Sequence, residues 1–190
     1  MVISSRIMTN RSLCIILLCA AMAVLVYNGS AEPEEARKRD AKSKDKVEVY
    51  LAKGEKDAHS STNVPLSQIE LEDVPLFTSD DVLHYDIDSD RFILNDTAYE
   101  AIQRVKLSVF GRSFVLMVGK RRVYKGALWD GWSSVTFDGV LIVRPMDKAN
   151  TELQLELGYP NKEQFTGQDP RHDPEVLSIL KDAGKAPGLH

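Results

Sequence analysis

The chain has 190 residues, of which 43% are hydrophobic and 27% are charged. This composition is typical of a globular protein and excludes a disordered, a collagen-like and a many-span membrane protein. The length allows one domain with flanking segments, and the excess of 28 acidic over 24 basic residues argues against nucleic acid as a partner.

The N-terminal segment has the layout of a secretory signal. Arg6 and Arg11 precede an apolar run over residues 13–27, and small residues follow at 29–31. A helix over that run would span about 22 Å, less than the roughly 30 Å hydrocarbon core of a membrane. We expect a cleaved signal peptide over residues 1–31, with an uncleaved N-terminal membrane anchor as the alternative. In both cases the rest of the chain is exported, periplasmic, secreted or anchored, and meets a membrane only through this segment.

Both cysteines, Cys14 and Cys19, lie inside this segment. The exported part therefore has no disulfide, no thiolate zinc site and no cysteine nucleophile. It must be stabilised by its own apolar core.

Residues 32–45 are nearly all charged or small and show no apolar periodicity. This pattern predicts a charged, solvated linker. Contact of its basic residues with anionic headgroups is the alternative, which the interleaved acidic residues disfavour.

From residue 46 to residue 183 the sequence alternates between strand and helix patterns. The predicted strands are 46–51, 69–72, 91–94, 114–118, 121–125, 135–137, 140–143 and 153–157. The predicted helices are 80–83, 96–105 and 174–183. Gly119-Lys120 predicts a type II′ turn, and Asp130-Gly131 and Asp138-Gly139 predict two further hairpin turns.

The C-terminal helix has the clearest end signals. Asp173 is the expected N-cap, Pro174 occupies the first turn, and Gly184 marks the end. Val176, Leu177 and Leu180 form its apolar stripe. Residues 184–190 are expected to be a tail outside the domain. The predicted fold is a single small α+β domain over residues 46–183, with a mainly antiparallel sheet, a β-α-β-β unit and a C-terminal helix.

One pattern resembles a metal site. Asp86, Asp88 and Asp90 have the spacing that opens a calcium loop, but Arg91 and Thr97 stand where such a loop needs glycine and glutamate, so a turn is favoured. The histidines lack metal-ligand spacing, and no G-x-S-x-G, G-x-G-x-x-G or P-loop motif occurs. We therefore predict no metal and no cofactor. The four histidines are His59, His84, His172 and His190.

Two further surface features have more than one interpretation. The basic run 119–122 is explained as charge on an edge strand that prevents association of sheets. The aromatic residues Tyr124, Trp129, Trp132 and Phe137 predict either core packing or one wall of a groove for peptide or sugar.

Three successive segments resemble a known family. They are LEDVPLFTSDDV (71–82), RFILNDTAYEAI (91–102) and FVLMVGKRRVYKGAL (114–128). Over residues 69–128 their order resembles the first periplasmic head subdomain of the preprotein translocase subunit SecD. Thr78, Asp81 and Val82 match a T-x-x-D-[IV] segment of that family, and Leu94, Asn95 and Ala98 match the start of its helix. The resemblance is to the head alone and implies a module that contacts exported polypeptide and performs no bond chemistry.

The expected function is that of an exported, non-enzymatic module that binds protein or peptide in the cell envelope or outside the cell. Its expected surface is the sheet face or edge near Tyr124, Trp129 and Trp132. The alternative is an exported hydrolase or metal-dependent enzyme that uses His84, Asp86 and His172. The enzyme requires these three side chains to converge in one cleft, whereas the binding module requires an exposed aromatic patch.

Overall fold

The computed structural model describes residues 45–54, 56–145 and 151–187. The expected signal peptide, residues 1–31, and all of the expected linker except Asp45 lie outside the described residues. Within the described ranges, no helix is long and apolar enough to cross a membrane.

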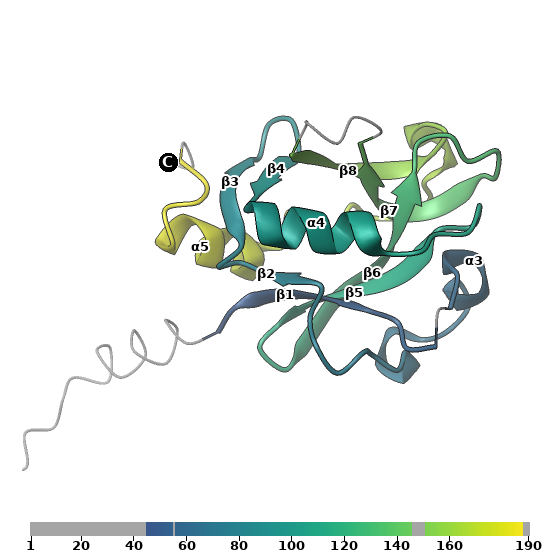
Figure 1. The fold of residues 1–190 in the computed structure, drawn as a ribbon, viewed down its shortest axis with the longest axis horizontal. Coiled ribbons are helices and arrows are strands. Elements are labelled where there is room, and N and C mark those ends of the chain that lie inside the picture. Colours follow the sequence, from purple (N-terminus) through teal and green to yellow (C-terminus); the bar gives the residue numbers. More distant parts are fainter. Residues whose placement is uncertain (1–44, 55, 146–150, 188–190) are drawn as a thin grey trace, which may run out of the picture. The chain divides into compact units, whose positions relative to one another are not determined.

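The described residues form an α+β fold with one eight-stranded sheet and few helices, as predicted (Figure 1). The strands are β1 (Val47–Leu51), β2 (Phe77–Thr78), β3 (Val82–Asp86), β4 (Arg91–Leu94), β5 (Arg112–Val118), β6 (Arg121–Asp130), β7 (Phe137–Arg144) and β8 (Glu152–Tyr159). The helices are α3 (Ala58–Ser61), α4 (Asp96–Arg104) and α5 (Pro174–Asp182), with 3-10 turns η1 (Leu66–Gln68) and η2 (Lys162–Gln164).

The sheet curls so that the end of edge strand β2 lies close to the start of edge strand β3. Its strand order is β2-β1-β5-β6-β7-β8-β4-β3, and all neighbours are antiparallel except β6 and β7. The two edge strands, β2 and β3, are consecutive in the chain, with only Ser79, Asp80 and Asp81 between them. Since a connection of this length spans at most about 14 Å, the end of β2 lies close to the start of β3, and the curled sheet partly encloses an interior. In Figure 1, β1, β5 and β6 form the lower part of the curl and β8, β4 and β3 the upper part.

Alternate side chains of the strands fill this interior, because successive side chains of a strand point to opposite faces. Both longer helices add to the same apolar cluster. Helix α4 contributes Ala98, Tyr99 and Ile102. Helix α5 contributes Val176 and Leu180, while Leu177 is half-buried.

The predicted helix at 80–83 is wrong. Instead, Thr78 ends β2 and Val82 begins β3. The Asp81 carboxylate accepts hydrogen bonds from the backbone N–H and the hydroxyl of Thr78 (2.9 and 3.0 Å). The Asp81 N–H donates to the Thr78 carbonyl at 3.0 Å. Thr78 and Asp81 therefore close a turn between two strands rather than start a helix.

The predicted turn at Asp138-Gly139 is also wrong. Strand β7 runs through both residues, and its register against β8 shifts between Phe137 and Val140, as at a β-bulge. At Asp130-Gly131 strand β6 does end, but no hairpin follows, because the next strand, β7, pairs parallel to β6. The predicted strand at 69–72 is reduced to one isolated bridge between Ala52 and Leu71.

The β-α-β-β unit is present as β4, α4, β5 and β6, but β4 pairs with β3 and β8 and not with β5. The β5–β6 hairpin is confirmed. Val118 pairs with Arg121 across Gly119-Lys120, and only the glycine of the two has a positive φ, +54°, as in a type II′ turn.

The basic run 119–122 lies where β6 pairs with β5 alone, because β7 pairs only with residues 126–130 of β6. Arg122 donates hydrogen bonds to the carbonyl oxygens of Leu66 and Ile69, both at 2.7 Å. Farther along β6, the Lys125 ammonium donates to three carbonyl oxygens, those of Ser61, Thr62 and Val64. These cations hold the segment around α3 and η1 against the outer face of the sheet, and burial lowers the pKa of Lys125.

Helix α5 has the predicted ends. The Asp173 carboxylate accepts from the N–H groups of Glu175 and Val176. At the other end Gly184 has a φ of +68°. The N–H groups of Gly184 and Lys185 donate to the carbonyls of Lys181 and Leu180, which is the Schellman pattern.

The expected tail begins too early. Ala186 is buried in the main core cluster, and the Tyr85 N–H donates to the Lys185 carbonyl at 2.7 Å. The domain therefore continues past residue 183, because the chain after α5 packs beside edge strand β3.

Replacement of Asp173 by alanine should lower the free energy of unfolding by about 0.5–2 kcal/mol through the lost cap. Asp173→Asn is the matched control, because asparagine caps as well as aspartate but does not form the ion pair with Arg121 (2.9 Å). Urea denaturation measures both. Equal stability of the alanine variant and the wild type would contradict the capping role.

The difference in unfolding free energy between the wild type and Asp173→Ala should depend on pH. The Arg121 hydrogen bond, together with the helix N–H groups, holds the pKa of Asp173 below its ordinary value of 3.8. A depressed carboxylate pKa stabilises the folded state above the unfolded pKa and ceases to do so as the pH falls through the folded pKa. The stability difference between wild type and Asp173→Ala should therefore be constant near neutral pH and shrink below about pH 4.

Candidate functional site

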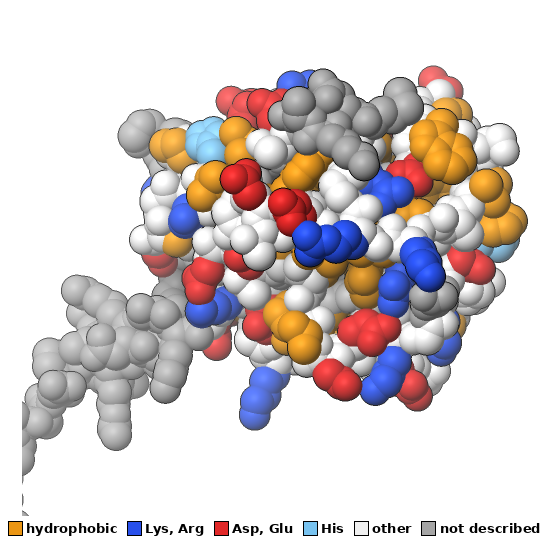
Figure 2. All heavy atoms as spheres, viewed as in Figure 1, with side chains coloured by type: hydrophobic (Ala, Val, Ile, Leu, Met, Phe, Trp, Pro, Cys, Tyr) orange, Lys and Arg blue, Asp and Glu red, His pale blue; other side chains and the backbone are white. Residues whose placement is uncertain are grey.

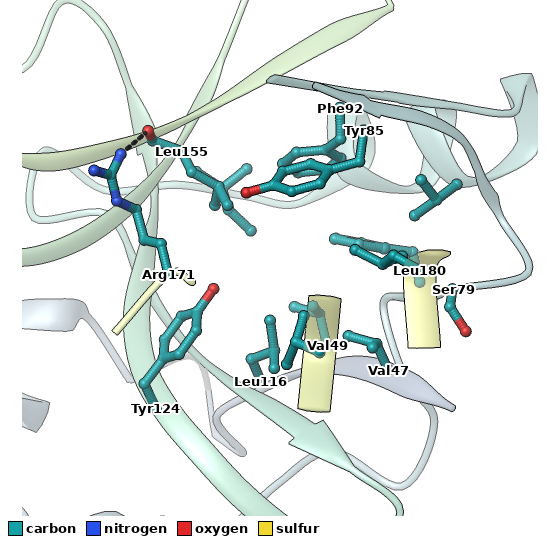
Figure 3. A pocket seen from close by; sticks show the side chains of 14 residues that line it. Val47, Val49, Ser79, Tyr85, Phe92, Leu116, Tyr124, Leu155, Arg171 and Leu180 are labelled. Carbon is teal, nitrogen blue, oxygen red and sulfur yellow. Dashed lines mark hydrogen bonds between the residues drawn. The ribbon is translucent and has the colours of Figure 1, made fainter. Parts of the chain in front are cut away.

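The interior of the curled sheet contains a cavity of about 50 Å³ that is partly open to solvent (Figure 3). Every strand of the sheet contributes to its wall, and the segment before α5 and α5 itself complete it. The lining residues are Val47, Val49, Phe77, Ser79, Val82, Tyr85, Phe92, Leu116, Tyr124, Ile142, Leu155, Arg171, Val176 and Leu180. Sites enclosed by a curled sheet are common places for ligands.

One side of the cavity is polar. Figure 3 shows the hydroxyl groups of Tyr85 and Tyr124 on the side where Arg171 lies. The Tyr85 hydroxyl donates to Asp90 Oδ1 at 3.2 Å. Burial raises the pKa of both tyrosines far above the ordinary value, so both remain neutral hydroxyl groups at neutral pH.

Asp90 organises the charges beside this polar side. It is buried, and its φ of +53° is unusual for a residue with a side chain. Its carboxylate contacts Arg171 at 2.6 Å and His172 Nε2 at 2.8 Å. Arg171 also pairs with Asp169 and donates to the Leu155 carbonyl at 2.9 Å. The last acid of the calcium-like pattern is therefore an ion-pair partner inside the fold.

Of the other two acids of that pattern, Asp86 ends β3 and Asp88 lies in the turn between β3 and β4. The Asp86 carboxylate accepts from the Asp88 N–H at 3.0 Å and the Ser89 hydroxyl at 2.7 Å. These bonds are those of an Asx turn, the interpretation that the sequence favours. Within the described ranges, no group of three His, Cys, Asp or Glu residues could hold a metal ion.

The alternative enzyme would use His84, Asp86 and His172, and these three side chains have different surroundings. His172 bonds to Asp90, and Asp86 bonds within its own turn. His84 precedes Tyr85 on β3, so its side chain is on the face opposite the cavity that Tyr85 lines. No hydrogen bond among the described residues joins His84, Asp86 and His172.

The four aromatic residues do not lie on one surface: Tyr124, Trp129 and Phe137 are buried, as in the core interpretation, and Trp132 is exposed. Trp129 and Phe137 pack together in a buried cluster on the outer side of the sheet, with ring centroids 5.4 Å apart. Tyr124 is buried and lines the cavity instead, because its position on β6 differs from that of Trp129 by an odd number of residues. Trp132 is 62% exposed and lies in the loop after β6.

Trp132 belongs to an exposed apolar patch that the sequence did not predict. We call Val109, Phe110 and Trp132 the Trp132 patch; they are three of the five large apolar side chains that are exposed in the described part of the chain. The Ser133 hydroxyl joins the two loops by donating to the Val109 carbonyl at 2.6 Å. The His59 ring of α3 lies 5.9 Å from the Phe110 ring. Figure 2 shows apolar side chains gathered at the right-hand edge, near the position of α3 in Figure 1, with a histidine beside them.

The loop that carries Val109 and Phe110 is held in place by Gly111. This glycine has a φ of +62°, and a Cβ there would lie 2.4 Å from the Trp129 ring. Only glycine fits this turn. Val109 and Phe110 are thus exposed because they precede a tight turn over the buried Trp129. The hydrophobic periodicity of the sequence does not reveal such a turn.

Comparison of the chain with protein-family models, with curated proteins and with solved structures finds no match.

Proposed function

We propose that the protein is an exported, non-enzymatic module that binds a protein or peptide through the Trp132 patch. The observation that carries the proposal is the exposure of Trp132, 62%, beside Val109 and Phe110, 44% and 38%. Adjacent exposed aromatic and aliphatic side chains are typical of binding surfaces, and tryptophan is the residue type most enriched among those that dominate binding energy.

The patch is preorganised, which favours binding over accidental exposure. The Ser133 hydroxyl accepts from the Val135 N–H at 3.2 Å while it donates to Val109. The Phe110 carbonyl accepts from the Ala58 N–H at 3.2 Å, which ties the patch to α3. A surface that is already ordered loses less conformational entropy when a partner binds.

The surroundings of the patch indicate the chemistry of the partner. Lys106 stands in the same loop as Val109, and Lys56 lies just before α3. Both are exposed, and neither forms an ion pair with another described residue. We therefore propose a partner segment in which apolar side chains are flanked by acidic residues, because opposite charges around an apolar centre increase the association rate and select the partner.

The resemblance of residues 69–128 to the SecD head supports this proposal, because that stretch contains Val109 and Phe110. A head module of that family contacts exported polypeptide. The signal-like N-terminal segment supports export to the same compartment.

Selection from a display library of random short peptides tests the proposal. The wild-type domain should enrich peptides in which aromatic or aliphatic residues stand beside Asp or Glu. Trp132→Ala should weaken binding of the synthesised winners about tenfold or more and leave the unfolding midpoint nearly unchanged, because the side chain is exposed.

Leu83→Ala is the matched control, since Leu83 is 56% exposed on edge strand β3. This variant should bind the selected peptides as the wild type does. Equal losses for the two variants, or enrichment of basic peptides, would contradict the proposal.

A further inference from the structure

The interior cavity is separate from the Trp132 patch and contains a polar group without a partner. Tyr124 is only 6% exposed, yet its hydroxyl forms no hydrogen bond with any described residue. By contrast, the Tyr85 hydroxyl is bonded to Asp90. The hydroxyl faces the partly open cavity, so a molecule there that hydrogen-bonds to it gains free energy. Figure 3 shows this hydroxyl at the cavity wall, on the side of Arg171.

The charges beside the cavity already balance one another. Arg171 contacts both Asp90 and Asp169 at 2.6 Å, and its side chain is 11% exposed. An anion in the cavity would compete with these carboxylates, and a cation would lie against the guanidinium. Either would lose hydration without a free counter-charge. The cavity is thus suited to a neutral molecule.

The size and the remaining lining restrict that molecule further. A volume of about 50 Å³ admits about three to five non-hydrogen atoms, at about 10–15 Å³ for each water-sized sphere. Apart from Ser79, Arg171 and the two tyrosines, all lining side chains are apolar. We propose that the cavity binds a short, neutral aliphatic molecule with one hydroxyl or carbonyl oxygen, which hydrogen-bonds to the Tyr124 hydroxyl.

Titration of the full chain with 1-propanol, followed by NMR of the Val and Leu methyl groups, tests the proposal. The methyl groups of Val49, Leu116 and Leu155 should shift saturably. Propionate and propylammonium, which have the same chain and a charge, should produce no saturable shift at equal concentration. Shifts that rise linearly over all methyl groups, or equal binding of the ions, would overturn the proposal and leave the cavity to water alone.

Three variants separate the cavity from other sites. Tyr124→Phe removes only the hydroxyl and should weaken 1-propanol binding about three- to tenfold, the range expected for one hydrogen bond. Val49→Ile adds one methylene to the wall and should abolish binding.

Tyr159→Phe is the control, because the Tyr159 hydroxyl donates to the Gly131 carbonyl and does not line the cavity. Unchanged affinity in both Tyr124→Phe and Val49→Ile would overturn the proposal, and the Trp132 patch would be unaffected by that result.

Discussion

Arg144→Met should destabilise the domain by about 3–5 kcal/mol, the cost of leaving one partner of a buried ion pair alone. The Arg144 guanidinium bonds to both oxygens of Asp130 at 2.8 and 2.9 Å, and the two side chains are 16% and 11% exposed. It also donates to the carbonyls of Gln103 and Val105 at the end of α4. One side chain thus joins β6, β7 and α4, and chemical denaturation measures its loss.

Arg104→Met is the matched control. Arg104 is also close to the end of α4, but its pair with Glu100 is exposed, at 74% and 60%. An exposed pair contributes about 0–1 kcal/mol. Replacement of both Asp130 and Arg144 by apolar residues should recover much of the lost stability, because no buried charge is left alone. A loss no larger than that of Arg104→Met would show that Arg144 does not join these elements.

Leu180→Ala should destabilise the domain by about 2–5 kcal/mol. Leu180 is 6% exposed, and it lies at the wall of the cavity together with Val176 of the same helix. A nine-residue helix is too short to persist alone in water, so α5 depends on this packing. The unfolding midpoint in urea measures the effect.

Lys181→Ala removes the exposed neighbour on the same helix and should change stability by no more than about 0.5 kcal/mol. If the two variants had equal midpoints, α5 would not pack against the sheet.

The elements that the sequence predicted correctly are those with local causes. The N-caps Asn95 and Asp173, the Gly119-Lys120 turn and the C-terminal Gly184 each determine the backbone within a few residues of themselves. For this reason α4, α5 and the β5–β6 hairpin were predicted close to their observed bounds, and the mainly antiparallel sheet followed from the strand patterns.

The elements that were predicted wrongly depend on distant partners. Asp138-Gly139 is a good turn signal, but β7 continues through it because β8 pairs along the same strand. The parallel pairing of β6 and β7 has no local signature either. The site could not be predicted for the same reason. Tyr124 faces the cavity and Trp129 the outer cluster, and which face of the sheet is the inner one depends on how the distant strands pair. Trp132 could be identified as a candidate, but its neighbours Val109 and Phe110 come from another loop.

The state of the two sheet edges bears on how the proposed polypeptide partner would be recognised. Many peptide-binding domains add the peptide as an extra strand to an open edge. Here β2 has two residues, and the Tyr85 N–H of β3 is already donated to the Lys185 carbonyl. Short and partly covered edges disfavour the addition of a further strand. We therefore expect the proposed polypeptide partner to be recognised by contacts between side chains rather than by addition of a strand.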